Sequence, residues 1–225
     1  MKKLLLALSI MIWTISSQAA DQDIKLPKIE AKAGMDVIQA METRAATRSY
    51  NGKEVPIEVT SLLLWAGSGI IKEKGNKTVH GYDAVSGATK RNRYTTPLGY
   101  GGGTQYMRVY LLLKDGAYLY LPKKHKLQFF TSKNLIKTSG SGGSKAHGVF
   151  VIAADYDALP KKYGDVTPTA FMTAGLIAQN MYVAGAVHNI KLLIQTGIRT
   201  KQITKALSLP NNIKPLAILP FGYIK

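Results

Sequence analysis

The sequence has 225 residues, 46% of them hydrophobic, no cysteine, and 30 Lys and Arg against 13 Asp and Glu, a formal net charge of +17. The lack of cysteine excludes a disulfide framework and thiolate chemistry. The charge favours anionic partners: nucleic acid, anionic lipid, a phosphate-bearing cofactor or an acidic protein. Nucleic acid is the weakest of these, because no motif carries a basic reading face. The lysines are also dispersed along the chain, a distribution more typical of solubility than of recognition.

Residues 1–19 have the features of an export signal. Two lysines, at positions 2 and 3, precede an apolar run of about 12 residues, and Ser17 and Ala19 suit the −3 and −1 positions of a signal-peptidase site. The run is short for a bilayer span. We therefore expect cleavage near Ala19-Ala20, a secreted or periplasmic location and no stable membrane insertion. Without the two lysines, 28 Lys and Arg remain against 13 acids, which gives the mature chain +15.

The elements expected first are an N-terminal arm, two helices and a hairpin. Residues 20–34 indicate an extended arm, and residues 35–225 a single domain. Apolar residues at helical spacing in "MDVIQAMETR" (35–44) and "PIEVTSLLLWAGSGI" (56–70) predict two helices, the second starting with a proline. Residues 71–105 form a long polar connection that should carry function or be disordered. "MRVYLLL" and "GAYLYLP" flank the turn Lys114-Asp115-Gly116 and predict a β-hairpin.

The second half of the chain predicts a buried strand, a central helix and two closing strands. "HGVFVIAAD" (147–155) is typical of a strand buried on both faces. "TPTAFMTAGLIAQNMYVAGAVHN" (167–189) predicts a buried helix of about 18 residues, capped by Thr167 or Thr169 with Pro168 in its first turn. A strand at "IKLLIQTGI", a short helix at "TKQITKALSL" and a strand at "PLAILPFGYI" follow. The sum is an α+β domain in which helices sandwich a mixed or antiparallel sheet.

Several chemistries lack support in the sequence. The four histidines are scattered, so we expect no metal site, and the sequence motifs of serine hydrolases and of nucleotide-binding loops are absent. What remains is the pair Arg44 and Arg48 in "METRAATRSYNGKEV", four residues apart at the end of a helical pattern and hence expected on one face. Two guanidinium groups on one face suit a terminal phosphate. A solvated basic face is the default interpretation of a single arginine pair.

The context of this pair resembles a known family. "RAATRSY" followed by "VPIEVTSLLLWAGSGI" is similar to the opening of the nitroreductase family, where a segment Arg-x-Ser-x-Arg/Lys-x-Phe binds the FMN phosphate. "LLLWAGSGI" is particularly similar to the SagB-type branch, whose members include azoline-oxidising dehydrogenases. "GYGGGTQYMRVYLL", "AGLIAQNMYVAGAVHNI", and "IQTGI" with "LAILPFGY" resemble later family segments in the same order. The resemblance covers most of residues 35–223 and depends on that order.

The resemblance implies a nitroreductase-like fold, FMN as cofactor and a set of site residues. Arg44, Ala45, Ala46 and Arg48 would lie at the flavin phosphate and ribityl chain, with Ala46 replacing the family's serine. Relatives carry a further basic phosphate ligand near their C-terminus, for which Lys225 is the candidate substitute. Tyr100, Gly101 and Gly103 would lie against the flavin.

The residues nearest the chemistry come from the same resemblance. Thr196 and Gly197 fall where the family offers a backbone N–H to the flavin N5, which stabilises charge as hydride reaches or leaves that atom. An ordinary turn glycine is an equally weighted interpretation of Gly197.

A second resemblance concerns the long polar connection. "DAVSGAT" (83–89) is similar to the Asp-x-x-Ser-Gly-Ala-Thr motif of periplasmic flavin-carrying domains, where a flavin transferase joins FMN to the threonine hydroxyl through a phosphoester. The acceptor would be Thr89. Outside the cytoplasm a covalent bond removes the mass-action loss of a dissociating cofactor. Arg91 stands where relatives show Ser or Thr, and a polar loop that happens to contain SGAT is the alternative.

Three functions remain open from the sequence. The first is an extracytoplasmic FMN-dependent oxidoreductase with ping-pong electron or hydride transfer, forming a homodimer because flavin sites in the family usually lie at a homodimer interface. NAD(P)H is the common donor of the family but is scarce outside the cytoplasm, so a membrane or periplasmic electron-transfer protein is the expected alternative. The second is a non-catalytic flavin- or ligand-binding protein on the same fold. The third is a basic protein that adheres to envelope polymers.

Overall fold

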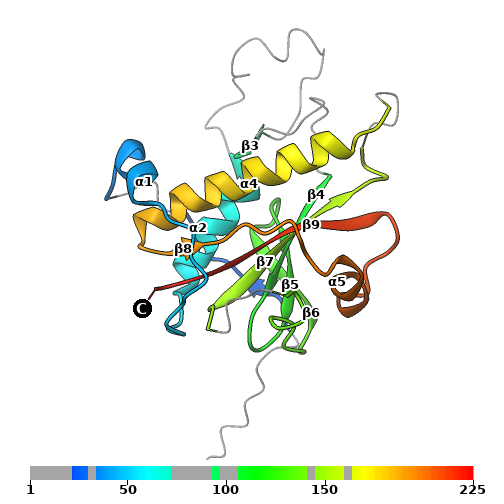
Figure 1. Cartoon of the computed structure of the whole chain (residues 1–225), viewed down its shortest axis with the longest axis horizontal. Coiled ribbons are helices and arrows are strands. Elements are labelled where there is room, and N and C mark those ends of the chain that lie inside the picture. Colours follow the sequence, from blue (N-terminus) through cyan, green and yellow to red (C-terminus); the bar gives the residue numbers. More distant parts are fainter. Residues whose placement is uncertain are drawn as a thin grey trace, which may run out of the picture.

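The computed structural model describes residues 22–29, 34–71, 93–96, 106–140, 145–159 and 164–224. Its centre is a seven-stranded antiparallel sheet with the order β1-β6-β5-β4-β7-β9-β8 (Figure 1). The strands are β1 (Ile24–Lys25), β4 (Met107–Leu112), β5 (Ala117–Leu121), β6 (Lys126–Thr131), β7 (Gly148–Asp155), β8 (Lys191–Leu192) and β9 (Ile213–Gly222). The helices are α1 (Val37–Thr43), α2 (Ile57–Ser68), α4 (Thr167–Val187) and α5 (Thr200–Ala206). The predicted α+β fold is confirmed, and the sheet is antiparallel.

The strand β7 shows why the sheet is covered on both sides. Phe150 and Ile152 belong to the hydrophobic cluster that lies under α2 and α4, whereas Val149 and Val151 belong to the cluster under α5. Successive side chains of a strand point to opposite faces, so a strand covered on both sides needs a continuous apolar run. The prediction made from residues 147–155 is confirmed. In Figure 1, α4 and α5 accordingly lie on opposite sides of the sheet.

The central helix α4 is longer than the sequence indicated and is capped differently. It has 21 residues, and its N-cap is Val166, which makes no side-chain capping bond. Thr167 and Thr169 lie inside the helix, so the prediction that one of them caps it is wrong, although Pro168 does occupy the first turn. By length and composition α4 qualifies as a membrane span, but half of its most apolar window is buried inside the domain. It packs mainly on α2 and α1.

The sheet contains pairings that periodicity alone did not indicate. The strand β6 joins the outer edge of the hairpin β4–β5 and also pairs with β1, which attaches the N-terminal arm to the domain. Of the strand expected from "IKLLIQTGI", only Lys191 and Leu192 form a regular ladder. Gln195 adds an isolated bridge to Ile218. The short helix and the final strand occur as predicted.

A separate two-stranded ladder holds together the two ends of the stretch between residues 71 and 93. β2 (Ile70–Ile71) pairs with β3 (Arg93–Tyr94) in antiparallel register. The Thr95 hydroxyl donates to the Trp65 carbonyl oxygen at 2.7 Å, and the Asn180 amide of α4 donates to the Thr96 hydroxyl at 2.9 Å. These bonds tie β3 to the C-terminal end of α2 and to the middle of α4. Both ends of the segment that carries "DAVSGAT" are therefore anchored beside these two helices.

Candidate functional site

The two arginines of the sequence motif follow α1 and are not part of it. The helix ends at Thr43, and Arg44 is its C-cap with an extended backbone (φ −60°, ψ 137°). The expectation that Arg44 and Arg48 share one helical face is therefore wrong. The reason is a long-range pairing: Ala46 forms a parallel bridge with Leu192 of β8, which draws the backbone away from the helix. Helix propensity is a weak preference that such tertiary pairing overrides.

Two side chains hold this cationic segment, residues 44–48, against the sheet. The Tyr50 hydroxyl, on a side chain only 2% exposed, lies 2.9 Å from the Pro220 carbonyl oxygen and 3.0 Å from that of Thr47. Lys191, only 8% exposed, donates from Nζ to the Thr43 carbonyl oxygen at 2.8 Å, where the end of α1 presents unpaired carbonyl groups. The backbone is thereby fixed on both sides of the segment.

The fixed backbone leaves the side chains of the segment in solvent. Arg44, Ala45, Ala46 and Arg48 are all exposed. Within the part of the chain that the structure describes, neither arginine has a carboxylate within ion-pair distance. The Arg44 guanidinium carbon lies 6.0 Å from the centre of the Tyr182 ring, a weak cation–π contact that orients the side chain. Two fixed cations without an acidic partner are available to an anion.

Tyr182 connects the cationic segment to the stretch after β8. Its hydroxyl oxygen accepts a hydrogen bond from the Ile194 backbone N–H at 2.8 Å. Burial raises the pKa of this hydroxyl, so Tyr182 is neutral at physiological pH. The segment around Arg44 and the stretch leading to residue 196 thus meet at one buried aromatic side chain, although about 150 residues separate them in the sequence.

The stretch 195–197 combines a buried amide with free backbone donors. Gln195 exchanges two backbone hydrogen bonds with Ile218, of 2.9 and 3.0 Å, after which Thr196 and Gly197 emerge into solvent. The N–H groups of Thr196 and Gly197 donate to no described residue. A Cβ added to Gly197 would meet no atom within 4 Å. The Gln195 amide nitrogen is buried and has no hydrogen-bond partner among the described residues. The buried Gln195 amide lacks an acceptor among the described residues, whereas the exposed N–H groups of Thr196 and Gly197 can donate to water or to a bound ligand.

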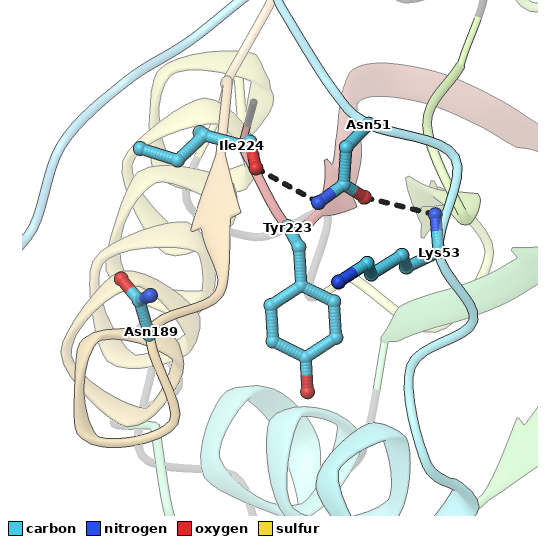
Figure 2. Close-up of a pocket in the computed structure, with 5 residues that line it drawn as sticks. All are labelled: Asn51, Lys53, Asn189, Tyr223 and Ile224. Carbon is cyan, nitrogen blue, oxygen red and sulfur yellow. Dashed lines mark hydrogen bonds between the residues drawn. The ribbon is translucent and has the colours of Figure 1, made fainter.

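A separate cavity lies between the segment that follows Arg48 and the end of β9 (Figure 2). Its volume is about 460 Å³, and it is lined by Asn51, Lys53, Asn189, Tyr223 and Ile224. The Asn51 amide donates to the Ile224 carbonyl oxygen at 2.8 Å and thereby closes one wall. The Lys53 amino group and the Tyr223 ring face the same space. The sequence had singled out none of these residues for a site, and Lys53 counted only among the dispersed lysines.

The structure does not describe the other predicted site residues. Thr89, Tyr100, Gly101, Gly103 and Lys225 lie outside the described residues. Among the residues that are described, no cluster of three His, Cys, Asp or Glu side chains could hold a metal ion.

Comparison with known proteins agrees with this architecture. The model of the nitroreductase family matches residues 41–223. The chain belongs to the nitroreductase family. This nitroreductase is 24% identical to a Methanocaldococcus jannaschii protein named as a nitroreductase, over 89% of the chain and 96% of that protein. Its fold matches that of a Ralstonia eutropha protein described as a nitroreductase, with a TM-score of 0.78, 21% identity, and coverage of 92% and 91% of the two chains. A chain in the Escherichia coli microcin synthetase complex has the same fold, with a TM-score of 0.63, 16% identity, and coverage of 98% and 85%.

Membership of the family implies a flavin, and the residues present fit FMN. Nitroreductases are generally flavin-dependent oxidoreductases and typically use FMN. The cations Arg44 and Arg48 suit a phosphate, and the free N–H groups at 196 and 197 suit the polar edge of a flavin ring. The sequence had not indicated Tyr50, Tyr182, Lys191 or Gln195. Their roles depend on partners 12 or more residues away, so no local pattern could have revealed them.

Proposed function

We propose that this nitroreductase is an extracytoplasmic FMN-dependent oxidoreductase of the SagB-type branch that transfers hydride or electrons in alternating half-reactions. The observation that carries the proposal is the bridge between Ala46 and Leu192. It joins the segment of Arg44 and Arg48, which have no carboxylate partner among the described residues, to the start of the stretch that leads to Thr196 and Gly197. An anionic cofactor with a polar ring needs both features in one place.

In this proposal the chain positions the cofactor and stabilises charge on it. FMN supplies the hydride-accepting and hydride-donating chemistry when it is bound. Arg44 and Arg48 neutralise its phosphate, and Tyr182 and Lys191 keep the segment that carries Arg44 in place. The N–H of Thr196 or Gly197 would be the donor to the flavin N5 and would stabilise negative charge on that side of the ring. Because both residues are exposed, a second reactant has access to the same edge.

A covalent tether at Thr89 is the finer form of the proposal. The ladder β2–β3 holds the two ends of the connection that carries Thr89 beside α2 and α4. The threonine hydroxyl would attack the FMN phosphorus of a flavin dinucleotide held by a flavin transferase, so that the phosphoester forms as the pyrophosphate bond breaks and a nucleoside monophosphate leaves. Export through the segment 1–19 supplies the reason for a bond, because a released cofactor is lost by dilution outside the cytoplasm.

We also propose a homodimer. Large apolar side chains remain exposed at two places, on α1 and in the first turns of α4, and exposed apolar patches are typical of interaction surfaces. These side chains, 36% exposed or more, are Val37, Ile38, Met41, Phe171, Met172 and Leu176. Burial against a second copy would remove them from water.

The absorbance spectrum of the purified protein tests the function. We expect flavin bands, or their appearance when FMN is added to colourless protein. Arg44→Ala and Arg48→Ala should each weaken FMN binding by about 10- to 100-fold, since a charge-assisted hydrogen bond is worth about 1.5–3 kcal/mol. The exposed Lys28→Ala is the control and should not change the affinity. A protein that takes up no FMN refutes the function. A flavin band that is lost on acid precipitation, or that survives acid precipitation in Thr89→Val, refutes only the tether.

A non-catalytic binding protein on the same fold is the second candidate. Its support is Ala46, an exposed methyl group where the family has a serine hydroxyl. This function predicts FMN binding without turnover. Anaerobic reduction of the bound flavin by dithionite, followed by its oxidation with a quinone or a nitroaromatic acceptor, separates the two. Oxidation no faster than that of free reduced FMN would favour the binding protein.

A further inference from the structure

The side of the domain that carries α5 gathers exposed cations. Its cations come from two segments that are about 65 residues apart in the sequence, residues 132–140 after β6 and residues 199–206 at α5. Leu135 and Ile136 of the first segment share a hydrophobic cluster with Ile203 and Leu207 at the second. A Cβ on Gly140 would lie 3.2 Å from the Arg199 side chain, so the segments also meet at this point. We name the basic face by its exposed members: Lys133, Lys137, Arg199, Lys201 and Lys205.

No acidic residue belongs to either segment. The sequence has no Asp or Glu at 116–154 or at 166–225, so both segments lie within acid-free stretches. None of the five cations has a carboxylate partner among the described residues. Asp115 comes near Lys133, because the neighbouring turn residue Gly116 packs against Thr131 and Ser132. The adjacent Lys114 offsets the negative charge of Asp115. The basic face therefore keeps its excess of positive charge.

The side chains of the basic face indicate which anionic partner it suits. Its apolar residues, Leu135, Ile136, Ile203 and Leu207, are all less than 9% exposed. A specific protein interface relies on several buried aromatic or aliphatic anchors, whereas the large apolar side chain that this side of the sheet exposes among the described residues is Phe130, which packs edge-on against Tyr110. Four of its five cations are lysines, which act as point charges and do not form the planar forks used in bidentate recognition. On α5, Lys201 and Lys205 are four residues apart and so project from the same side.

We propose that the basic face docks the protein on the surface of an anionic phospholipid bilayer. The headgroup phosphates supply the negative charge, and no part of the face inserts. The proposal is independent of the flavin chemistry. It has one consequence for that chemistry: Thr196 and Gly197 are exposed and lie just before Arg199, so docking brings the candidate flavin edge close to the membrane surface. Lipid-soluble electron carriers would then reach it without an aqueous intermediary.

Sedimentation with vesicles tests the docking. The purified mature protein, residues 20–225, is mixed with vesicles of 30% phosphatidylglycerol in phosphatidylcholine, and with phosphatidylcholine alone. We expect binding only to the first, with most of it lost between 0.05 and 0.5 M NaCl because the screening length shortens. Since each lysine near an anionic surface strengthens binding about fivefold, Lys201→Gln with Lys205→Gln should weaken it about 30-fold.

The matched control is Lys25→Gln with Lys28→Gln. Both lysines are exposed and lie in the arm around β1, which pairs with the start of β6, whereas residues 132–140 follow its end. The control removes the same net charge and should weaken binding less than threefold. If both double variants lose the same vesicle affinity, the total charge of the protein and not the basic face determines binding, and the proposal is overturned. Failure to bind phosphatidylglycerol vesicles also overturns the proposal. If such a protein is retained on immobilised polyglutamate, the partner of the basic face is an acidic protein. FMN uptake, measured in parallel, should be unchanged in both variants.

Discussion

The contribution of the Tyr50 hydroxyl, which anchors the cationic segment, can be tested with one substitution. Tyr50→Phe removes one hydroxyl group and leaves the ring, which packs over Gly222, in place. The Pro220 carbonyl oxygen loses the Tyr50 hydroxyl but keeps the Leu193 N–H, which donates to it at 3.1 Å. Thr47 is only half-buried, so water can replace the hydroxyl at its carbonyl oxygen. No group is left buried without a partner, and the cost is therefore that of one ordinary hydrogen bond, about 1 kcal/mol.

Urea denaturation followed by circular dichroism measures this cost. A loss of about 1 kcal/mol corresponds to a decrease of roughly 2–4 °C in Tm for a domain of this size. FMN affinity should fall by no more than about fivefold, because the hydroxyl acts only by holding residues 44–48 and cannot transmit more than its own free energy.

Tyr223→Phe is the control for the same chemical change. Its hydroxyl makes no hydrogen bond to a described residue and faces the cavity of Figure 2, so stability should not change. Two outcomes would refute the reasoning. Unchanged stability of Tyr50→Phe would mean that the hydroxyl does not anchor the segment. A loss above about 3 kcal/mol would mean that a carbonyl group is left buried and unpaired.

Three further predictions concern packing, pH and association. Gly185→Ala should destabilise the protein by about 1–3 kcal/mol, because the new Cβ would lie 2.7 Å from Leu192 Cδ1. Gly175→Ala in the same helix is the control: its Cβ would meet no atom within 4 Å, and the substitution should stabilise the protein by roughly 0.5–1 kcal/mol. Burial holds the pKa of His147 below its usual 6.5, and the neutral ring accepts a hydrogen bond at Nδ1 from the Val55 N–H. As the pH falls, the His147 imidazole therefore takes up a proton in the unfolded chain before it does so in the folded protein. The free energy of unfolding should thus decrease as the pH falls below about 6.5, and in His147→Gln urea midpoints measured between pH 5 and 8 should lose that dependence. Met172→Glu should convert the proposed homodimer to a monomer in sedimentation equilibrium, while Lys201→Glu should not; a dimer that survives Met172→Glu would place the interface elsewhere.

Much of the fold follows from local patterns. The hairpin at residues 107–122, the buried strand β7 and the central helix α4 all have an apolar periodicity long enough to identify their type. The limits of α4 were less certain, since Thr167 and Thr169 both suit a cap and only the observed backbone selects Val166. The strand β6 was missed because only Leu127 of its six residues is fully buried and its stability comes from pairing with β5.

The candidate site was predictable only in part. The arginines at 44 and 48 and the glycine at 197 were indicated by a family resemblance that the match over residues 41–223 supports. Their arrangement was not, because the helical spacing of the arginines suggested one face, whereas the bridge from Ala46 to β8 makes the backbone extended. Lys191 and Gln195 had no local signal at all.

By itself the sequence determined the order of most of the longer elements, the α+β class, the family and the excess of positive charge. These depend on residue types, on their spacing over a few residues and on segments in a recognisable order. Only the tertiary structure decided which groups lack partners and which charges stand together. The basic face shows the reason: lysines that are dispersed along the chain at 133, 137, 201 and 205 meet because Leu135 and Ile136 bury their side chains with Ile203 and Leu207. The long-range packing that builds the core thus also gathers the surface charge, and no window of the sequence contains both segments.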